Sequence, residues 1–185
     1  MTDWDTLAAE VRTCTRCPEL AATRTQVVVG ARPEGARLLV VGEAPGAQED
    51  ESGLPFVGRS GQLLDRLLAE VGGDRARTAV LNTLKCRPPG NRPPTRPETA
   101  NCRPWTAQQV ALVAPDVVVT LGLSATRWFL PGKEPLGTVR GRVHEVEGVQ
   151  VLPTYHPSAA LRNGPQGEPM ALLREDLALA VRLTS

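Results

Sequence analysis

Residues 37–61 read RLLVVGEAPGAQEDESGLPFVGRSG, and this stretch decides the fold. Residues 38–41 form a continuous apolar run, which is typical of a strand covered on both faces. The glycine- and proline-rich segment 42–46 ends the strand, and leucines at helical spacing follow from about Ser60. In an open α/β sheet such a loop lies at the carboxyl end of a strand, where ligands bind. Because the loop also carries several acids and Phe56, we expect a small molecule or a base to bind there.

Three more apolar runs predict buried strands at residues 78–82, 116–121 and 149–154. Helical patterns alternate with them at about 4–12, 97–114, 124–130 and 168–183. This order predicts an α/β fold, a three-layer αβα sandwich around a mainly parallel, four-stranded sheet. Residues 139–146 could add an edge hairpin arm. With 185 residues and 41% hydrophobic content, we expect one domain over residues 1–185.

The composition gives no global sign of a nucleic-acid partner, since the formal net charge is +1. Of the 21 basic residues, 19 are arginines, which suit phosphates and planar groups, but a GC-rich genome explains this bias equally well. No apolar run approaches the ~20 residues needed to cross a bilayer. The amino terminus also lacks the pattern of a signal peptide. We therefore expect a cytoplasmic protein without a membrane partner.

The chain has four cysteines, which are Cys14, Cys17, Cys86 and Cys102. In a cytoplasmic protein disulfides are an uncommon use of four cysteines, whereas four thiolates suit tetrahedral zinc or an iron–sulfur cluster. Pro18 directly after the second cysteine fits the Cys-Pro pattern of cluster sites. The segment between Cys86 and Cys102 contains five prolines and cannot form a core of its own. Metal binding by these two cysteines would anchor the segment at both ends. Four unrelated buried cysteines are the alternative.

Polar residues follow three of the predicted strands, namely Glu43, Asn82 and His156. Because the carboxyl ends of parallel strands share one edge of a sheet, we expect these side chains to converge. Together with Phe56 they could hold and modify a flat polar ring. Each also has a plain alternative as a solvated acid, a turn residue or a strand cap.

These features resemble family 4 uracil-DNA glycosylases, the iron–sulfur branch of the uracil-DNA glycosylase superfamily. The matching pieces cover nearly the whole chain, from Cys14 to about Arg174. They are GEAPG at 42–46, GLPFVG at 53–58, Asn82 after a strand, HPS at 156–158 and the four cysteines.

The resemblance implies that a flipped uracil binds in a pocket. Phe56 would stack on the ring, and Asn82 would accept from uracil N3–H and donate to O4, a pattern that cytosine does not match. His156 would stabilise the charge that develops on uracil O2, and Glu43 would orient or deprotonate the attacking water. Backbone N–H groups around Gly42 and Ala44 would help to bind the base.

The resemblance also implies DNA contacts and a cofactor. Ser60 and Ser158 are candidates for phosphate contacts, although Ser60 could equally be a plain helix cap. Residues 159–163 resemble the intercalation loop, with Leu161 as the wedge and Arg162 on the backbone. Arg92 and other arginines of the proline-rich segment could reach phosphates. A [4Fe–4S] cluster with a structural role would be held by the four cysteines.

The implied activity is that of a monofunctional glycosylase in base excision repair, which releases uracil from single- or double-stranded DNA and leaves an abasic site. Lys85 is the one lysine near the motifs, so we expect no Schiff-base lyase step. We expect a monomer, whose product passes to abasic-site repair enzymes. The alternative is a non-catalytic iron–sulfur or zinc protein that binds a nucleotide or nucleic acid.

Overall fold

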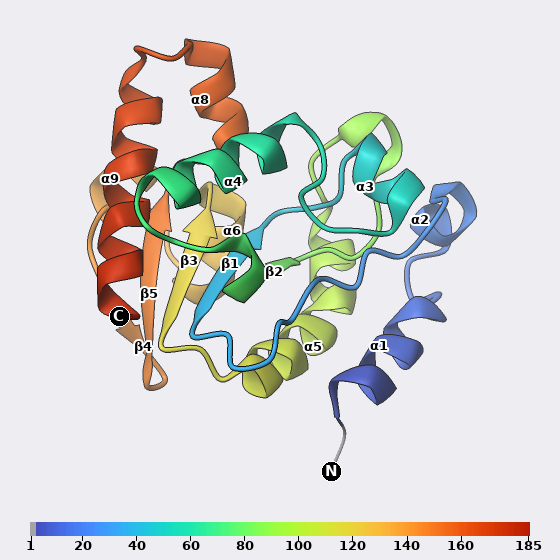
Figure 1. The fold of residues 1–185 in the computed structure, drawn as a ribbon. Coiled ribbons are helices and arrows are strands. Elements are labelled where there is room, and N and C mark those ends of the chain that lie inside the picture. The colour runs from blue at the N-terminus through green and yellow to red at the C-terminus, as the bar shows by residue number, and fades with distance from the viewer. Residues whose placement is uncertain (1–2) are drawn as a thin grey trace.

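The computed structural model describes residues 3–185, which form a three-layer αβα arrangement (Figure 1). The helices are α1 (Trp4–Arg12), α2 (Pro18–Thr23), α3 (Ala47–Ser52), α4 (Arg59–Glu70), α5 (Arg96–Val113), α6 (Leu123–Phe129), α7 (Leu136–Val139), α8 (Pro157–Asn163) and α9 (Glu168–Leu183). The strands are β1 (Leu38–Gly42), β2 (Thr78–Asn82), β3 (Val117–Leu121), β4 (His144–Val146) and β5 (Val149–Thr154). Short 3-10 turns occupy Arg75–Arg77 and Pro89–Asn91.

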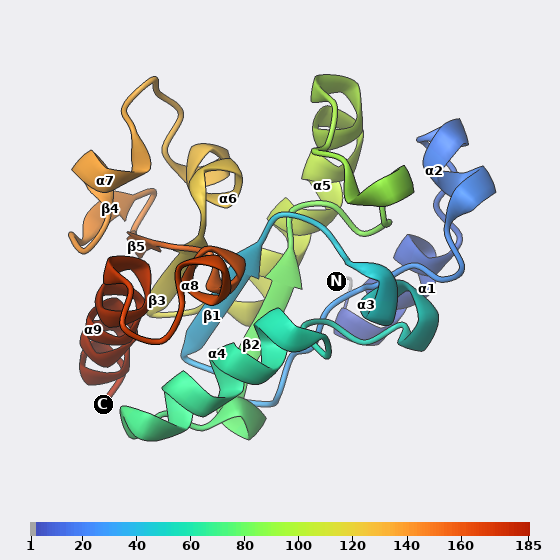
Figure 2. The same ribbon diagram turned by 90° about the horizontal axis from the view of Figure 1, so that it is seen from above.

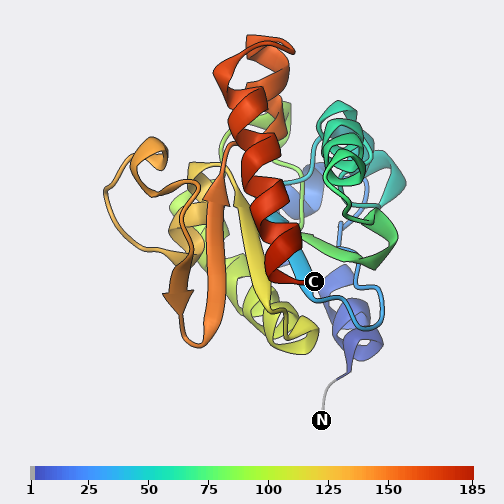
Figure 3. The same cartoon turned by 60° about the vertical axis from the view of Figure 1, so that its left-hand side comes forward.

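The strands form one sheet in the order β2-β1-β3-β5-β4. The four predicted strands pair in parallel, which confirms the sequence-based fold. One further strand, β4, was not among the four predicted. It pairs antiparallel with β5 at the edge of the sheet, where the hairpin arm was expected (Figure 3). Its alternating partial burial explains why it lacks the apolar run of the other strands.

Helices cover both faces of the sheet, with α4, α8 and α9 on one side and α5 and α6 on the other (Figure 2). The apolar run of β1 alternates between the two faces, since Val40 packs in the first core and Leu39 and Val41 in the second. Leucines of α4 at helical spacing close the first core, and Leu64 and Leu67 are fully buried. Each such side chain contributes about 1.5–3 kcal/mol of hydrophobic free energy.

A third core cluster lies beside the β2 edge, where α1, α2 and α5 meet. It contains Leu7, Leu20 and Trp105 as well as the cysteine side chains. Helix α5 begins with a capping box between Thr95 and Glu98, and the irregular part of the proline-rich segment ends there. No helix among residues 3–185 is long and apolar enough to span a bilayer.

Two segments for which the sequence analysis predicted no helix are helical. The cysteine segment contains α2, which Pro18 starts at its first position. The segment assigned to an intercalation loop is the short helix α8, which begins at Pro157. In both cases a proline occupies the first helical turn, where its missing N–H leaves no hydrogen bond unmade.

Candidate active site

Two of the three polar residues predicted at the carboxyl edge of the sheet, Asn82 and His156, line one cavity of about 100 Å³ together with Phe56. Gly42 and Asn82 are register partners at the ends of β1 and β2. His156 follows β5 by two residues, on the far side of the cavity. The residues that line the cavity are Ala44, Gly46, Glu49, Phe56, Ser60, Asn82 and His156. The predicted convergence is therefore present for Asn82 and His156, but not for the side chain of Glu43.

Phe56 is held in an uncommon conformation beside the cavity. Its φ of 55° is left-handed, and its ring is buried, with a centroid 6.2 Å from that of His156. Two glycines make room for it. A Cβ on Gly42 would lie 2.5 Å from the Phe56 ring and 2.5 Å from Oδ1 of Asn82, and one on Gly61 would overlap the Phe56 carbonyl. The loop thus presents an aromatic face directly beside the Asn82 amide.

Asn82 is 3% exposed and faces the cavity. No hydrogen bond found within residues 3–185 uses its side-chain amide, although its backbone carbonyl is bonded. The amide faces the cavity with its donor and acceptor unused by the protein, so it is available for a ligand with a matching donor and acceptor.

His156 caps α8 and is oriented by the next turn of chain. Its Nδ1 accepts from the backbone N–H of Ser158 at 3.1 Å and lies 2.9 Å from the Ser158 hydroxyl. Burial, together with the positive charge of Arg162, lowers the pKa of His156 to about 4, although Glu49 opposes this shift. The ring is therefore neutral near pH 7, and because Nδ1 accepts, its proton resides on Nε2. The residue can donate to a ligand without carrying a charge.

Glu49 is a cavity residue to which the sequence analysis gave no role. Its Oε1 accepts from the N–H groups of Val57 and Gly58 at 2.9 and 2.8 Å, and its Oε2 accepts from Gly46 N–H at 3.1 Å. The carboxylate therefore ties the two halves of the loop together. A glutamate three residues after a glycine N-cap, as in a capping box, was the sequence sign that could have identified it.

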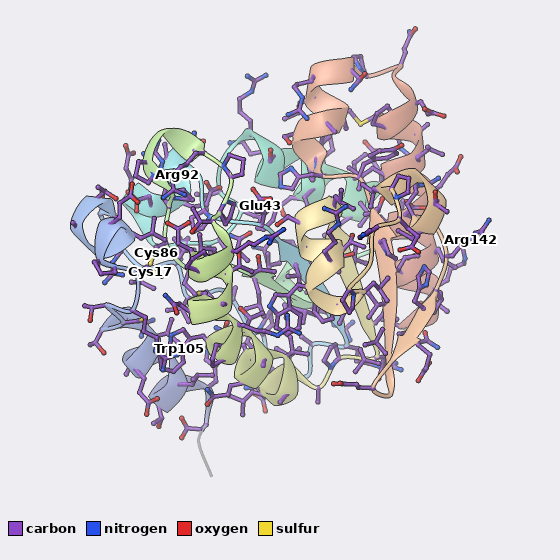
Figure 4. The ribbon with its side chains drawn as sticks, turned by 180° about the vertical axis from the view of Figure 1, so that it is seen from behind. Cys17, Glu43, Cys86, Arg92, Trp105 and Arg142 are labelled. Atoms are coloured by element: carbon purple, nitrogen blue, oxygen red, sulfur yellow. The ribbon has the colours of Figure 1, made fainter. Side chains whose placement is uncertain are left out.

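Glu43, the predicted acid, does not line the cavity by its side chain. It is partly buried between Gly42 and Ala44, and its backbone carbonyl accepts from Leu84 N–H and the Thr83 hydroxyl. Figure 4 shows its side chain toward the middle of the molecule, near the end of β1. Unlike Glu49, its carboxylate makes no hydrogen bond found within residues 3–185.

The four predicted DNA-contacting residues lie together next to the cavity. With Arg59 they line a second depression of about 310 Å³, which shares Ser60 with the cavity. Ser60 is the second residue of α4, and Gly58 takes the N-cap position. Arg162 donates to the Ser158 hydroxyl at 3.3 Å, and Leu161 is partly buried on α8. An open groove with two arginines suits an anionic strand.

The four cysteines also come together, in a small cavity between α2 and α5 that lies away from the base cavity. Figure 4 shows Cys17 and Cys86 side by side, with Trp105 on α5 below them. Donors point at three of the sulfurs. Trp105 Nε1 lies 3.3 Å from Cys14 Sγ, Arg24 Nη1 lies 3.1 Å from Cys86 Sγ, and Asn101 Nδ2 lies 3.7 Å from Cys17 Sγ.

This donor set fits a metal–sulfur cluster better than a single metal ion. Within residues 3–185 no three cysteine, histidine or acidic side chains come close enough to hold one ion, although all four thiols line the same cavity. A single zinc ion requires its sulfurs within about 2.3 Å of one point, whereas in a cubane cluster each thiolate binds a different iron. N–H donors aimed at sulfur are also a feature of such clusters.

The proline-rich segment between the last two cysteines is held by an ion pair. Arg92, expected near phosphates, instead donates to both carboxylate oxygens of Glu98 at 2.9 and 2.7 Å and to Glu19 at 3.2 Å. These contacts hold the pKa of Glu98 down at about 2. Arg92 therefore contributes to the structure of the cysteine region, and a phosphate contact by this residue stays a prediction.

Together, the fold and the site define an α/β protein that takes one flat polar ring, such as an extruded nucleobase, into a cavity beside a cationic groove. Residues 29–178 match the family described as the Uracil DNA glycosylase superfamily. The type-4 uracil-DNA glycosylase of Thermotoga maritima is 45% identical over 159 residues, which cover 85% of this chain and 82% of that protein. The type-4 uracil-DNA glycosylase of Saccharolobus solfataricus is 39% identical over 174 residues (89% and 80%), and that of Pyrobaculum aerophilum is 41% identical over 160 residues (82% and 81%). The chain belongs to the type-4 uracil-DNA glycosylases of this superfamily.

Proposed function

We infer that this chain removes uracil from DNA by hydrolysing the N-glycosidic bond, as a DNA repair enzyme. The observation that carries the inference is the single cavity in which Phe56, Asn82 and His156 meet, in a chain of the type-4 family. The alternative of a non-catalytic binding protein has no observation in its favour.

In the proposed complex the flipped uracil stacks on Phe56, and the Asn82 amide pairs with N3–H and O4. Support comes from the amide that faces the cavity without a protein partner. Cytosine has an acceptor at N3 and a donor at position 4, so it would leave the amide mispaired. This arrangement accounts for selection of uracil.

We propose that His156 stabilises the leaving base. As the C1′–N1 bond breaks, its electron pair moves onto uracil and negative charge collects on O2. A neutral Nε2–H donor there binds the transition state more strongly than the ground state, which lowers the barrier. The bond from Ser158 N–H to Nδ1 supports this role, because it leaves Nε2 as the donor.

Water then adds to C1′, and its proton needs an acceptor. We propose Glu43 for this role, since its carboxylate is free of hydrogen bonds among the described residues. Glu49 uses its oxygens for three backbone N–H groups, so it is better suited to shape the cavity. The groove formed by Ser60, Ser158, Leu161 and Arg162 is the proposed path of the DNA strand.

We propose that Cys14, Cys17, Cys86 and Cys102 hold a [4Fe–4S] cluster. When bound, the cluster would supply iron–thiolate bonds that join α2, the β2 edge and α5. Hydrolysis needs no electrons, and the cysteine cavity is separate from the base cavity, so the proposed role is structural. Broad visible absorption, with the iron and sulfide stoichiometry of [4Fe–4S], would support it, whereas colourless zinc protein would refute it.

We further propose that the protein acts as a monomer in the cytoplasm, since one chain supplies both the cavity and the groove. Light scattering after size exclusion tests the oligomeric state, and cell fractionation tests the location.

The deciding experiment uses an end-labelled oligonucleotide with one uracil, incubated with cluster-loaded protein and then cleaved by alkali at abasic sites. Cleavage at the uracil position only, and none in matched oligonucleotides with thymine or cytosine there, is the expected result. Absence of cleavage would refute the proposed function.

A further inference from the structure

Lys85 is a buried cation that the proposed mechanism does not use. It is 2% exposed, and within residues 3–185 none of the ion pairs found includes it. Placing a charge in the protein interior is costly unless hydrogen bonds and opposite charges compensate for it. A lysine in this position therefore calls for a physical reason.

The side chain of Lys85 connects the two sites of the protein. Its Nζ donates to the backbone carbonyl of Asn82 at 2.5 Å. The residue also lines the cysteine cavity, close enough to the thiols of Cys86 and Cys102 for their charges to interact with it. Thiolates that bind iron would supply the missing negative charge.

The bond to Asn82 acts on a peptide unit that is also held at its other end. The carbonyl of Asn82 and the N–H of Thr83 belong to the same planar group. Thr83 N–H donates to the carbonyl of Gly42 at 2.9 Å, while Lys85 holds the carbonyl side. With the peptide plane held at both ends, the ψ angle of Asn82 is restrained, and this fixes the backbone from which its side chain enters the cavity.

We propose that Lys85 is a positioning residue that couples the four-cysteine site to base reading by Asn82. The inference rests on the proposed roles of Asn82 and of the cysteines. Lys85 does not touch the base. It transmits the rigidity of the cysteine site to the amide that reads the base.

The test compares the binding of two DNA duplexes by Lys85→Met, which keeps the bulk of the side chain and removes its charge and donor. One duplex carries 2′-fluoro-2′-deoxyuridine, a uracil nucleotide that resists hydrolysis, and the other carries a tetrahydrofuran abasic analogue at the same position. Lys85→Met should weaken binding of the fluorinated duplex by about tenfold or more, the scale of a lost charge-assisted hydrogen bond. Binding of the abasic duplex, which offers Asn82 nothing to read, should change less than about twofold.

Thr106→Val is the matched control. Thr106 is buried, and its hydroxyl donates to the carbonyl of Thr83 at 3.1 Å. The substitution Thr106→Val therefore removes a hydrogen bond to the neighbouring peptide but none to Asn82. The ratio of the two affinities should stay at the wild-type value in this variant. In an Asn82→Ala background, Lys85→Met should cause no further loss for the fluorinated duplex, since the residue through which it acts is gone.

Equal weakening for both duplexes, or an undiminished effect in the Asn82→Ala background, would overturn the proposal. If circular dichroism shows that Lys85→Met is unfolded, Lys85→Gln is compared in the same way. The ratio of its affinities for the two duplexes should change as expected for Lys85→Met. Iron content is measured for every variant, and loss of iron with an unchanged affinity ratio would also overturn the coupling. Failure of the proposed function is a separate result, because the wild-type protein itself would then not release uracil.

Discussion

Uracil release should be nearly independent of pH between pH 8 and pH 5 as far as His156 is concerned. Burial and the charge of Arg162 lower the pKa of this imidazole to about 4. At pH 5 about nine tenths of such a group is still neutral, whereas an imidazole with its ordinary pKa of about 6.5 would be only about 3% neutral. The population of the neutral Nε2–H donor thus falls by about a tenth in the first case and about thirtyfold in the second.

The assay is single-turnover excision with enzyme in excess over a uracil duplex, at constant ionic strength. Rates at pH 8, 7, 6 and 5 should agree within about twofold. His156→Gln should lower the rate by about 10²- to 10³-fold at every pH, the scale of a lost donor to a developing oxyanion. Visible absorption before and after each reaction checks that acid has not removed the proposed cluster. A rate that rises or falls through an apparent pKa near 6.5 in the wild type, but not in His156→Gln, would refute the argument.

The same pKa shift predicts how stability responds to acid. The folded pKa lies below the unfolded value, so the unfolded chain takes up the proton first as the pH falls. The contribution of His156 is fully present above about pH 6.5 and is lost as the pH falls toward 4, by roughly 3 kcal/mol in total. The thermal midpoint of the wild type should therefore fall further between pH 8 and pH 5 than that of His156→Gln. Equal decreases in the two midpoints would contradict the lowered pKa of His156.

Other predictions concern selectivity, space, charge and stability. Asn82→Asp should lower uracil excision by about 10- to 100-fold and relax rejection of cytosine, as measured by kcat/KM on both oligonucleotides, and unchanged values would exclude base reading by this residue. Gly42→Ala should lower excision by about 100-fold or more with normal iron content, because its Cβ would lie 2.5 Å from the Phe56 ring, and full activity would show that the loop can yield. Arg162→Ala should reduce the slope of log binding constant against log salt by about 1, a change that a residue outside the DNA groove would not cause. Asp176→Ala should destabilise the fold by about 3–5 kcal/mol, since it leaves a buried ion pair broken, and a thermal midpoint unchanged from wild type would contradict this.

The sheet could be predicted because its strands are buried on both faces. Such strands must be apolar at every position, so residues 38–41 and 117–119 are recognisable without any knowledge of their neighbours. The short edge strand β4 has no such requirement, and only its pairing with β5 defines it. The helices α2 and α8 are six and seven residues long, too short for a periodic pattern, so local turn chemistry decides them.

The site residues could be predicted in part, for a related reason. Polar groups directly after apolar strands stand out in the sequence, which is how Asn82 and His156 were found. Glu49 lies within a run of acids, and its capping-box position after Gly46 predicts only a contact at the helix start, not a place in the cavity. Its role depends on the N–H groups of Val57 and Gly58, eight and nine residues further along, and these approach only when the loop folds back.

Sequence by itself determined the alternation of buried strands and helices, and it showed the four cysteines and the types of polar group at the sheet edge, because each depends on local patterns of residue types. Tertiary structure alone decided which nitrogen of His156 carries the proton, which carboxylates are already bonded and where the ammonium of Lys85 lies. These properties depend on burial and on donors from distant segments, as when Arg162 and Ser158 surround His156 or the Lys85 side chain reaches back to Asn82. Electrostatic energies change steeply with distance and with exclusion of water, and neither quantity exists until the chain is folded.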